Sequence, residues 1–168
     1  MGNFFSDLFK YTQTERSTPL ENFSTELLKY ILENNHDILK MFLPDNYNET
    51  ELDLIDIHTQ YYLQGHGIAD LLITNNETLG VIIKNKIYAD FQENQISRYK
   101  EYLSSNYEYN YVVALITLDY NFEKLECGEP DKKIYWSTLV DNLERIRKDK
   151  NDMIIHEVQV YKGEQYVL

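Results

Sequence analysis

The fold is decided by residues 67–99, which read GIADLLITNNETLGVIIKNKIYADFQENQISRY. Two β-prone apolar runs, Ile68–Thr74 and Leu79–Ile87, are separated by the turn residues Asn75-Asn76-Glu77, so we predict a hairpin of two strands. The apolar centre of the second run predicts burial on both faces. Residues 90–103 open with DFQE, which has the form of a capping box and predicts a helix.

The N-terminal side of this stretch predicts two helices and one further strand. A capping box, Thr18-Pro19-Leu20-Glu21, precedes apolar residues at four-residue spacing, which predicts an amphipathic helix over Pro19–Asn34. A short helix is expected over His36–Phe42, before Pro44. Asp53–Leu63 is predicted to be a strand, ended by Gly65-His66-Gly67.

The C-terminal side predicts alternating strands and helices. Tyr111–Leu118 is a buried strand, Lys133–Trp136 a short extended segment, Ser137 the cap of a helix to about Lys148, and Met153–Tyr161 a last strand. We therefore predict an α/β fold, with a mixed central β-sheet flanked by helices and an α-β-β-β-α-β order at its core.

Length and sequence continuity predict a single domain over residues 1–168, in which residues 1–17 are a lead-in. Because the chain ends on apolar residues, we expect that a natural C-terminal continuation is missing. A lone cysteine, Cys127, excludes an internal disulfide, and with no basic leader and no long apolar run it predicts a cytoplasmic protein without a membrane segment.

The charge balance bears on possible partners. The chain has 28 acidic and 16 basic residues and a formal net charge of −12. This excess opposes non-specific binding to a phosphate backbone, which depends on counterion release by Lys and Arg. If the partner is a nucleic acid, we expect a homo-oligomer or an additional domain or subunit to supply basic surface.

The predicted hairpin carries charged residues that are suited to phosphoryl chemistry. Asp70 on its first strand and Lys86 near the end of its second can converge on one sheet edge. A carboxylate there can hold Mg²⁺, and an ammonium can orient water or stabilise charge on phosphorus. Lys84 shares the face of Lys86, while Asn85 points the other way. The apolar start of the strand favours a site over lysines that only protect a sheet edge.

These residues resemble the PD-(D/E)XK nuclease superfamily. There, a helix supplies a Glu, a strand an Asp, the next strand (D/E)-x-K, and the following helix often Q-x-x-x-Y. The matching positions are Glu26, Asp70, Lys84-Asn85-Lys86, and Gln95 with Tyr99. The likeness runs from LENFSTELL (20–28) to YVVALITLDY (111–120) and is similar to a bacterial branch whose strand reads V-I-I-E-N-K-I.

The resemblance implies a restriction-endonuclease-like core that hydrolyses DNA phosphodiester bonds, in restriction or anti-phage defence. It implies Mg²⁺ or Mn²⁺ as cofactor, held by Glu26 and Asp70. Lys84, Lys86, Gln95 and Tyr99 complete the implied catalytic site. Glu21 is interpreted as the capping partner of Thr18 rather than as part of this site.

The sequence departs from the family at one position, because Lys84 stands where the pattern has a metal-binding acid. With an acid there, the implied site would carry a net charge of −2 and match one divalent cation; with Lys84 its charges sum to zero. We therefore predict impaired metal binding and catalysis, whether the lysine was introduced or arose by natural loss of activity. Glu77 or Asp90 is the alternative source of the missing acid.

Two other functions stay open on the sequence. The first is a non-catalytic pseudonuclease that acts as a DNA-binding or protein-interaction module. The second is a ligand-free structural domain, which predicts that Glu26, Asp70 and Lys86 lie scattered in space.

Overall fold

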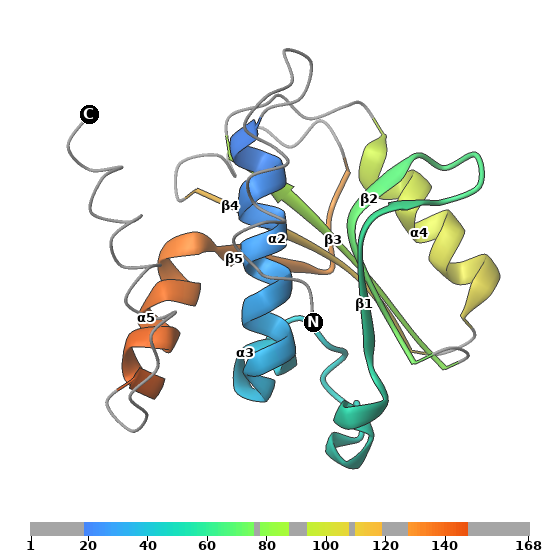
Figure 1. Ribbon diagram of the computed structural model, residues 1–168. Coiled ribbons are helices and arrows are strands. Elements are labelled where there is room, and N and C mark those ends of the chain that lie inside the picture. The colour runs from blue at the N-terminus through green and yellow to red at the C-terminus, as the bar shows by residue number, and fades with distance from the viewer. Residues whose placement is uncertain (1–18, 76–77, 88–93, 108–109, 119–127, 148–168) are drawn as a thin grey trace.

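Five strands form one mixed sheet in the order β1-β2-β3-β4-β5 (Figure 1). The computed structural model describes residues 19–75, 78–87, 94–107, 110–118 and 128–147. β1 and β2 pair antiparallel, as do β2 and β3, while β3–β4 and β4–β5 pair parallel. The strands are β1 (Asp56–Tyr62), β2 (Ile68–Thr74), β3 (Leu79–Lys86), β4 (Asn110–Thr117) and β5 (Lys132–Tyr135).

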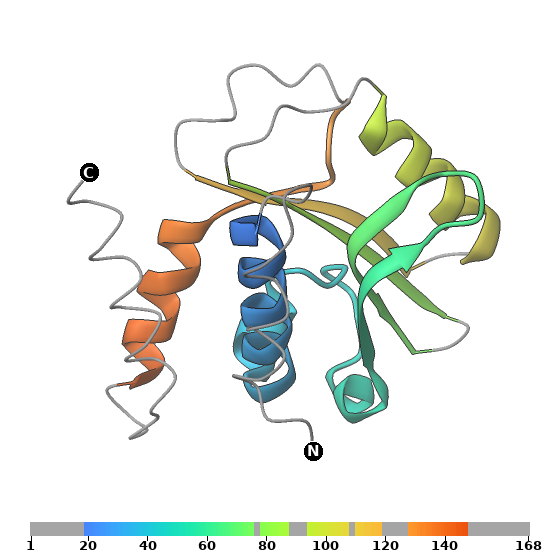
Figure 2. The same ribbon diagram turned by 45° about the horizontal axis from the view of Figure 1, so that its top comes forward.

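Helices cover both faces of the sheet, which confirms the predicted α/β architecture. The helical elements are α2 (Pro19–Asn34), α3 (His36–Lys40), the 3-10 helix η1 (Glu49–Leu54), α4 (Gln95–Asn106) and α5 (Trp136–Arg147). Figure 2 shows α2, α3 and α5 on one side of the sheet and α4 on the other. Within the described residues, no helix has both the length and the apolar character that crossing a bilayer requires.

Each face of the sheet has its own apolar core. The α2-side core includes Leu28, Leu71 and Ile83, and the α4-side core includes Ile82 and Leu103. β3 lies between the two cores, and all eight of its residues are buried, as its apolar sequence predicts. The last residues of this strand therefore reach the sheet end from within the molecule.

Several predicted boundaries hold and others are wrong. The helix predicted over residues 90–103 is observed as α4 over Gln95–Asn106, because Asn94 is in the left-handed conformation and precedes the first helical turn. The predicted helix Pro19–Asn34 and strand Ile68–Thr74 match the structure. The strand predicted from Asp53 begins at Asp56, because η1 occupies Glu49–Leu54 and the Asn48 side chain caps it by accepting a hydrogen bond from Thr50 N. α5 begins at Trp136, so Ser137 is its second residue rather than its cap. The predicted capping box at 90–93 and strand at 153–161 lie outside the described residues.

The β1–β2 hairpin is bent in its middle. Gln60 and Asp70 face each other without pairing, although the register is the same on either side of them. Gln60 has φ +51°, a left-handed conformation that is unfavourable for a residue with a side chain. Leu71 packs in the α2-side core, yet Ala69 packs in the α4-side core, so the strand's alternation is broken at Asp70. The hairpin tip consequently turns towards α4 (Figures 1 and 2).

Candidate active site

The Asp70 carboxylate lies where the β2–β3 ladder ends. The last paired residues are Leu71 and Ile83, and beyond them the carboxylate takes the place of a backbone partner. Its Oδ2 accepts a hydrogen bond from the Asn85 backbone N at 2.7 Å, and its Oδ1 accepts one from Lys84 Nζ at 2.8 Å. The bend at Gln60 and Asp70 thus places this carboxylate against the end of β3.

The Asp70–Lys84 pair is largely removed from water, since the two side chains are 13% and 11% exposed. Burial raises the pKa of the Asp70 carboxyl above its usual range, and the Lys84 ammonium opposes that rise without cancelling it. The negative charge of Glu21 raises the pKa of Asp70 further. Lys84 therefore stabilises the ionised form of this carboxylate against the effect of burial.

The carboxylate whose charge acts on Asp70 comes from Glu21, in the first turn of α2. Its Oε1 accepts a hydrogen bond from the Ile87 backbone N at 3.2 Å, just past the end of β3. The sequence interpretation of Glu21 as only a capping partner is therefore incomplete, and Thr18, the other half of that box, lies outside the described residues. Helical periodicity could not have separated these two roles.

Glu26, the predicted site acid of the same helix, has a different environment. Its Oε1 accepts a hydrogen bond from Thr59 Oγ1 of β1 at 2.8 Å. The side chain thus ties α2 to the edge strand at the level where the hairpin bends. Its assignment as a metal ligand stays a prediction.

Gln95 and Tyr99 lie on one side of α4 and contact each other. Gln95 Nε2 donates to Tyr99 Oη at 2.9 Å, and Tyr99 Oη donates to the Ile68 backbone O at 2.7 Å, two residues before Asp70 in the chain. Burial raises the pKa of the Tyr99 phenol, and the Asp70 charge raises it further. The hydrogen bond to Ile68 brings the α4 motif within two residues of Asp70 in the chain, and we call Asp70, Lys84, Glu21, Gln95 and Tyr99 together the Asp70 cluster.

The two lysines at the end of β3, Lys84 and Lys86, are both buried. Counted over the whole residue, Lys84 is 9% exposed and Lys86 is 7% exposed, which is rare for lysine and does not fit side chains that only protect a sheet edge. Both lie in β3, which is central rather than an edge strand. The structure therefore favours a charged site over the purely protective role.

Asn85, between the lysines, faces the opposite side of the sheet and is fully buried. Its Nδ2 donates to Ser24 Oγ at 2.7 Å and to Thr25 Oγ1 at 3.2 Å, and its Oδ1 accepts from Trp136 Nε1 at 3.1 Å. This amide joins α2, β3 and α5 at one point. Sequence reasoning placed it on the far face but missed this role, because the partners of its side chain lie 51 to 64 residues away.

These residues do not fit a divalent cation as they stand. Both oxygens of Asp70 already accept hydrogen bonds, one of them from an ammonium, and Mg²⁺ at 2.0–2.1 Å from that oxygen would lie against the positive charge of Lys84. Among the residues that the structure describes, no three His, Cys, Asp or Glu side chains form a group that could hold a metal. The alternative acids, Glu77 and Asp90, lie outside the described residues.

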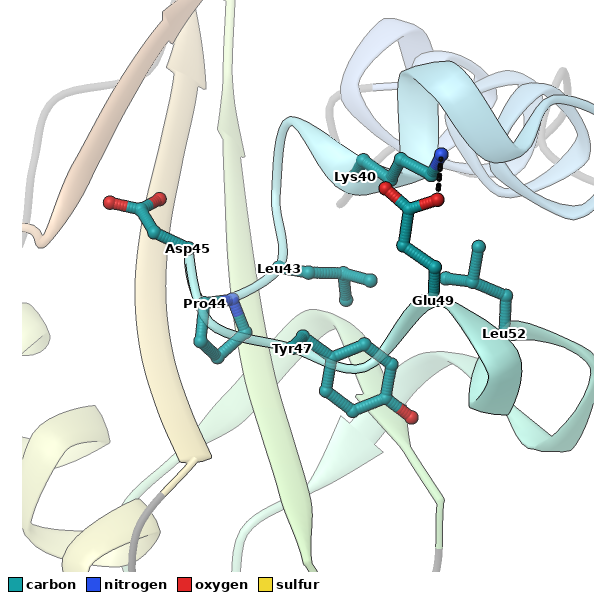
Figure 3. Close-up of a pocket in the computed structure, with 7 residues that line it drawn as sticks. All are labelled: Lys40, Leu43, Pro44, Asp45, Tyr47, Glu49 and Leu52. Carbon is teal, nitrogen blue, oxygen red and sulfur yellow. Dashed lines mark ion pairs between the residues drawn. The ribbon is translucent and has the colours of Figure 1, made fainter.

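A separate hollow of about 250 Å³ lies beside the segment that joins α3 to η1 (Figure 3). Its charged groups include Lys40 and Glu49, which pair at 3.0 Å, and Tyr47 and Leu52 form part of its wall. It contains none of the predicted site residues. We interpret it as a packing feature of the turn between the two helical elements.

Comparison with known protein families identifies the family of this chain. A sequence profile of the PD-(D/E)XK nuclease superfamily matches residues 9–162. That range contains every residue of the Asp70 cluster. No curated protein and no solved structure matches the chain.

Proposed function

Because the chain belongs to the PD-(D/E)XK nuclease superfamily, we propose that it is a DNA-directed nuclease domain whose cleavage is impaired by Lys84. The observation that carries this proposal is the buried ion pair between Lys84 Nζ and Asp70 Oδ1, at 2.8 Å. The Lys84 ammonium pairs with the carboxylate that the family uses to bind a divalent metal. The chain then keeps the nuclease fold and has its own cation in the place of the metal.

The energetic argument rests on charge and distance. Two unit positive charges about 4 Å apart repel by about 4 kcal/mol at an effective dielectric constant of about 20, and a divalent ion doubles the repulsion. The family acid would have contributed a ligand at this position, so the substitution both removes an attraction and adds a repulsion. Loss of several kcal/mol of metal-supplied transition-state stabilisation slows hydrolysis by roughly a hundredfold to ten-thousandfold or more.

We assign the remaining side chains to positioning of the DNA backbone and of the attacking water. Lys86 is the family's catalytic lysine in this scheme, and Gln95 and Tyr99 hold the β2 strand that carries Asp70. We assign the second acidic residue of the site to Glu21 rather than to Glu26, because the negative charge of Glu21 raises the pKa of Asp70. Comparing Glu21→Gln with Glu26→Gln in a cleavage-competent background separates the two assignments.

The test is cleavage of plasmid and linear DNA, with Mg²⁺ and with Mn²⁺, by the chain and its Lys84→Glu variant. A Lys84→Met variant removes the ammonium without adding an acid, so it separates relief of the block from restoration of the ligand. Asp70→Asn combined with Lys84→Glu is the inactive control. Circular dichroism verifies that each variant is folded.

We expect metal-dependent cleavage from Lys84→Glu alone, accompanied by metal binding in calorimetry. Cleavage by the unaltered chain would overturn the proposed block. A folded Lys84→Glu variant that binds metal and cuts no DNA would overturn the proposal that this site was built for DNA hydrolysis.

A non-catalytic module is the second candidate, and the net charge of −12 favours a protein partner for it. In this case the fold serves as a binding surface and Lys84→Glu gains no activity. For either form we propose restriction or anti-phage defence as the context. Expression of the Lys84→Glu variant in a phage-challenged bacterium tests that context.

A further inference from the structure

The bent end of the β1–β2 hairpin carries an exposed apolar pair. Tyr62 is 65% exposed and Ile68 is 52% exposed, and the two are direct cross-strand partners. Such partners project from the same face of a hairpin, with their side chains in contact range. The pair therefore forms one small apolar platform facing solvent.

The hairpin end is anchored against α4. Leu63 is fully buried in the α4-side core, and the His66 ring meets the edge of the Tyr102 ring at a centroid distance of 5.9 Å. The Tyr99 hydroxyl holds the Ile68 carbonyl at 2.7 Å. Because the backbone beneath the platform is fixed in this way, little conformational entropy is lost when a ligand binds to it.

The platform adjoins the candidate active site and lies in a segment without acidic residues. Ile68 is two residues from Asp70, and its carbonyl is bound by the same Tyr99 that belongs to the Asp70 cluster. Residues 59–69 read TQYYLQGHGIA and contain no Asp or Glu, in a chain that has 28 of them. The exposed Glu101 carboxylate on α4 lies 3.8 Å from the His66 Nδ1. An anionic polymer thus meets no negative charge from the hairpin end itself.

We propose that Tyr62 is a stacking platform for an unpaired base of single-stranded nucleic acid. The backbone of that strand would continue from Tyr62 to the sheet edge at which Asp70 meets the end of β3. This rests on the proposed function, which makes that edge a nucleic-acid site. An unpaired base has a free π-face to stack on tyrosine, whereas a base within a duplex has both faces covered by its neighbours. Ile68 supports the ring from beside it.

A second copy of the chain is the competing occupant, and the bend argues against it. Extension of a sheet across an edge requires a regular strand, and Gln60, at φ +51°, interrupts β1 two residues before Tyr62. The interrupted strand offers a poor template for continuous pairing. A nucleobase needs only the ring face.

The experiment measures fluorescence anisotropy of a labelled oligothymidylate and of a labelled duplex at low ionic strength. The proteins are the full chain, Tyr62→Ala, Tyr62→Trp and Tyr111→Ala. Tyr111 is the matched control, because it is a 36% exposed tyrosine at the start of β4, paired with Gly80 at the far end of β3 from Lys84. Circular dichroism and sedimentation verify folding and oligomeric state.

We expect Tyr62→Ala to weaken single-strand binding by roughly 5- to 150-fold, the range for loss of one stacked base. Tyr62→Trp and Tyr111→Ala retain the affinity of the unaltered chain. The salt dependence of binding stays unchanged in Tyr62→Ala, because no phosphate contact is lost.

Equal single-strand affinity of Tyr62→Ala and Tyr111→Ala would overturn the platform, while cleavage by Lys84→Glu would leave the proposed function standing. A dimer that Tyr62→Ala dissociates, with unchanged DNA affinity, would overturn it in favour of self-association. Absence of DNA binding by every protein, together with absence of cleavage by Lys84→Glu, would overturn both proposals.

Discussion

Replacing Lys84 with methionine isolates the energetic role of its ammonium. Methionine is apolar and close to lysine in length, so the substitution removes the charge and keeps most of the packing. The Asp70 carboxylate then has one remaining hydrogen bond, from Asn85 N at 2.7 Å, in a site where its side chain is 13% exposed. Breaking a buried ion pair by removing one partner costs about 3–5 kcal/mol. We expect the free energy of unfolding at pH 7 to fall by that amount.

The loss should depend on pH in a defined direction. Burial already raises the folded-state pKa of Asp70 above the ordinary value of 3.8. The folded protein therefore binds this proton more tightly than the unfolded chain, and the contribution of Asp70 to stability falls as pH rises from 3.8 through the folded-state pKa. Loss of the Lys84 ammonium raises the folded-state pKa of Asp70 further, so the fall in stability continues to a higher pH. The difference between Lys84→Met and the unaltered chain should therefore grow as pH rises above the folded-state pKa of Asp70 in the unaltered chain, and should be largest at neutral pH.

Urea unfolding followed by circular dichroism across this pH range measures both effects. The double variant Asp70→Asn with Lys84→Met removes both charges and keeps an acceptor for Asn85 N, so it should recover most of the lost stability. A Lys84→Met variant as stable as the unaltered chain at pH 7 would refute the reasoning. So would a double variant that is no more stable than the single one.

Three further predictions concern the scaffold. Gly80→Ala should cost about 1–3 kcal/mol, because its Cβ would lie 2.3 Å from the Tyr107 ring, and Tyr107→Ala should relieve that cost in thermal unfolding. Tyr99→Phe should cost about 1–3 kcal/mol, because it leaves the Ile68 carbonyl without its 2.7 Å donor; spectrophotometric titration should also lose one tyrosine of raised pKa. Gln60→Gly should leave stability within about 0.5 kcal/mol, since relief of φ +51° offsets the added chain entropy, whereas Gln60→Val should cost about 1–2 kcal/mol in denaturant titration.

Local patterns were enough to predict most of the fold. The capping residues and four-residue apolar spacing located the helix Pro19–Asn34, and the continuous apolar run of β3 located the strand buried on both faces. Two positive-φ glycines, Gly65 and Gly67, lie where the sequence predicted the end of the first strand. These features are encoded within a few residues, so sequence alone identifies them.

The features that sequence reasoning missed depend on tertiary contacts. The bend at Gln60 leaves no compositional signal, because glutamine is an ordinary strand residue apart from its φ of +51°. Glu21 satisfies a capping pattern and also reaches the end of β3, and only the packing of α2 on the sheet separates the two roles. The contact of Glu26 with Thr59 likewise depends on how α2 packs against β1 and has no signal in the local sequence.

The Asn85 amide has a consequence for how this molecule can change over generations. Neighbouring residues of β3 have separate roles. The Asn85 side chain binds α2 and α5 on one face of the sheet, while Lys84 and Lys86 lie on the other face with the Asp70 cluster. Substitutions that alter chemistry can accumulate at the outer positions without loosening the attachment of the helices. A lineage with this arrangement can lose an activity and later regain it, and the same framework survives both events.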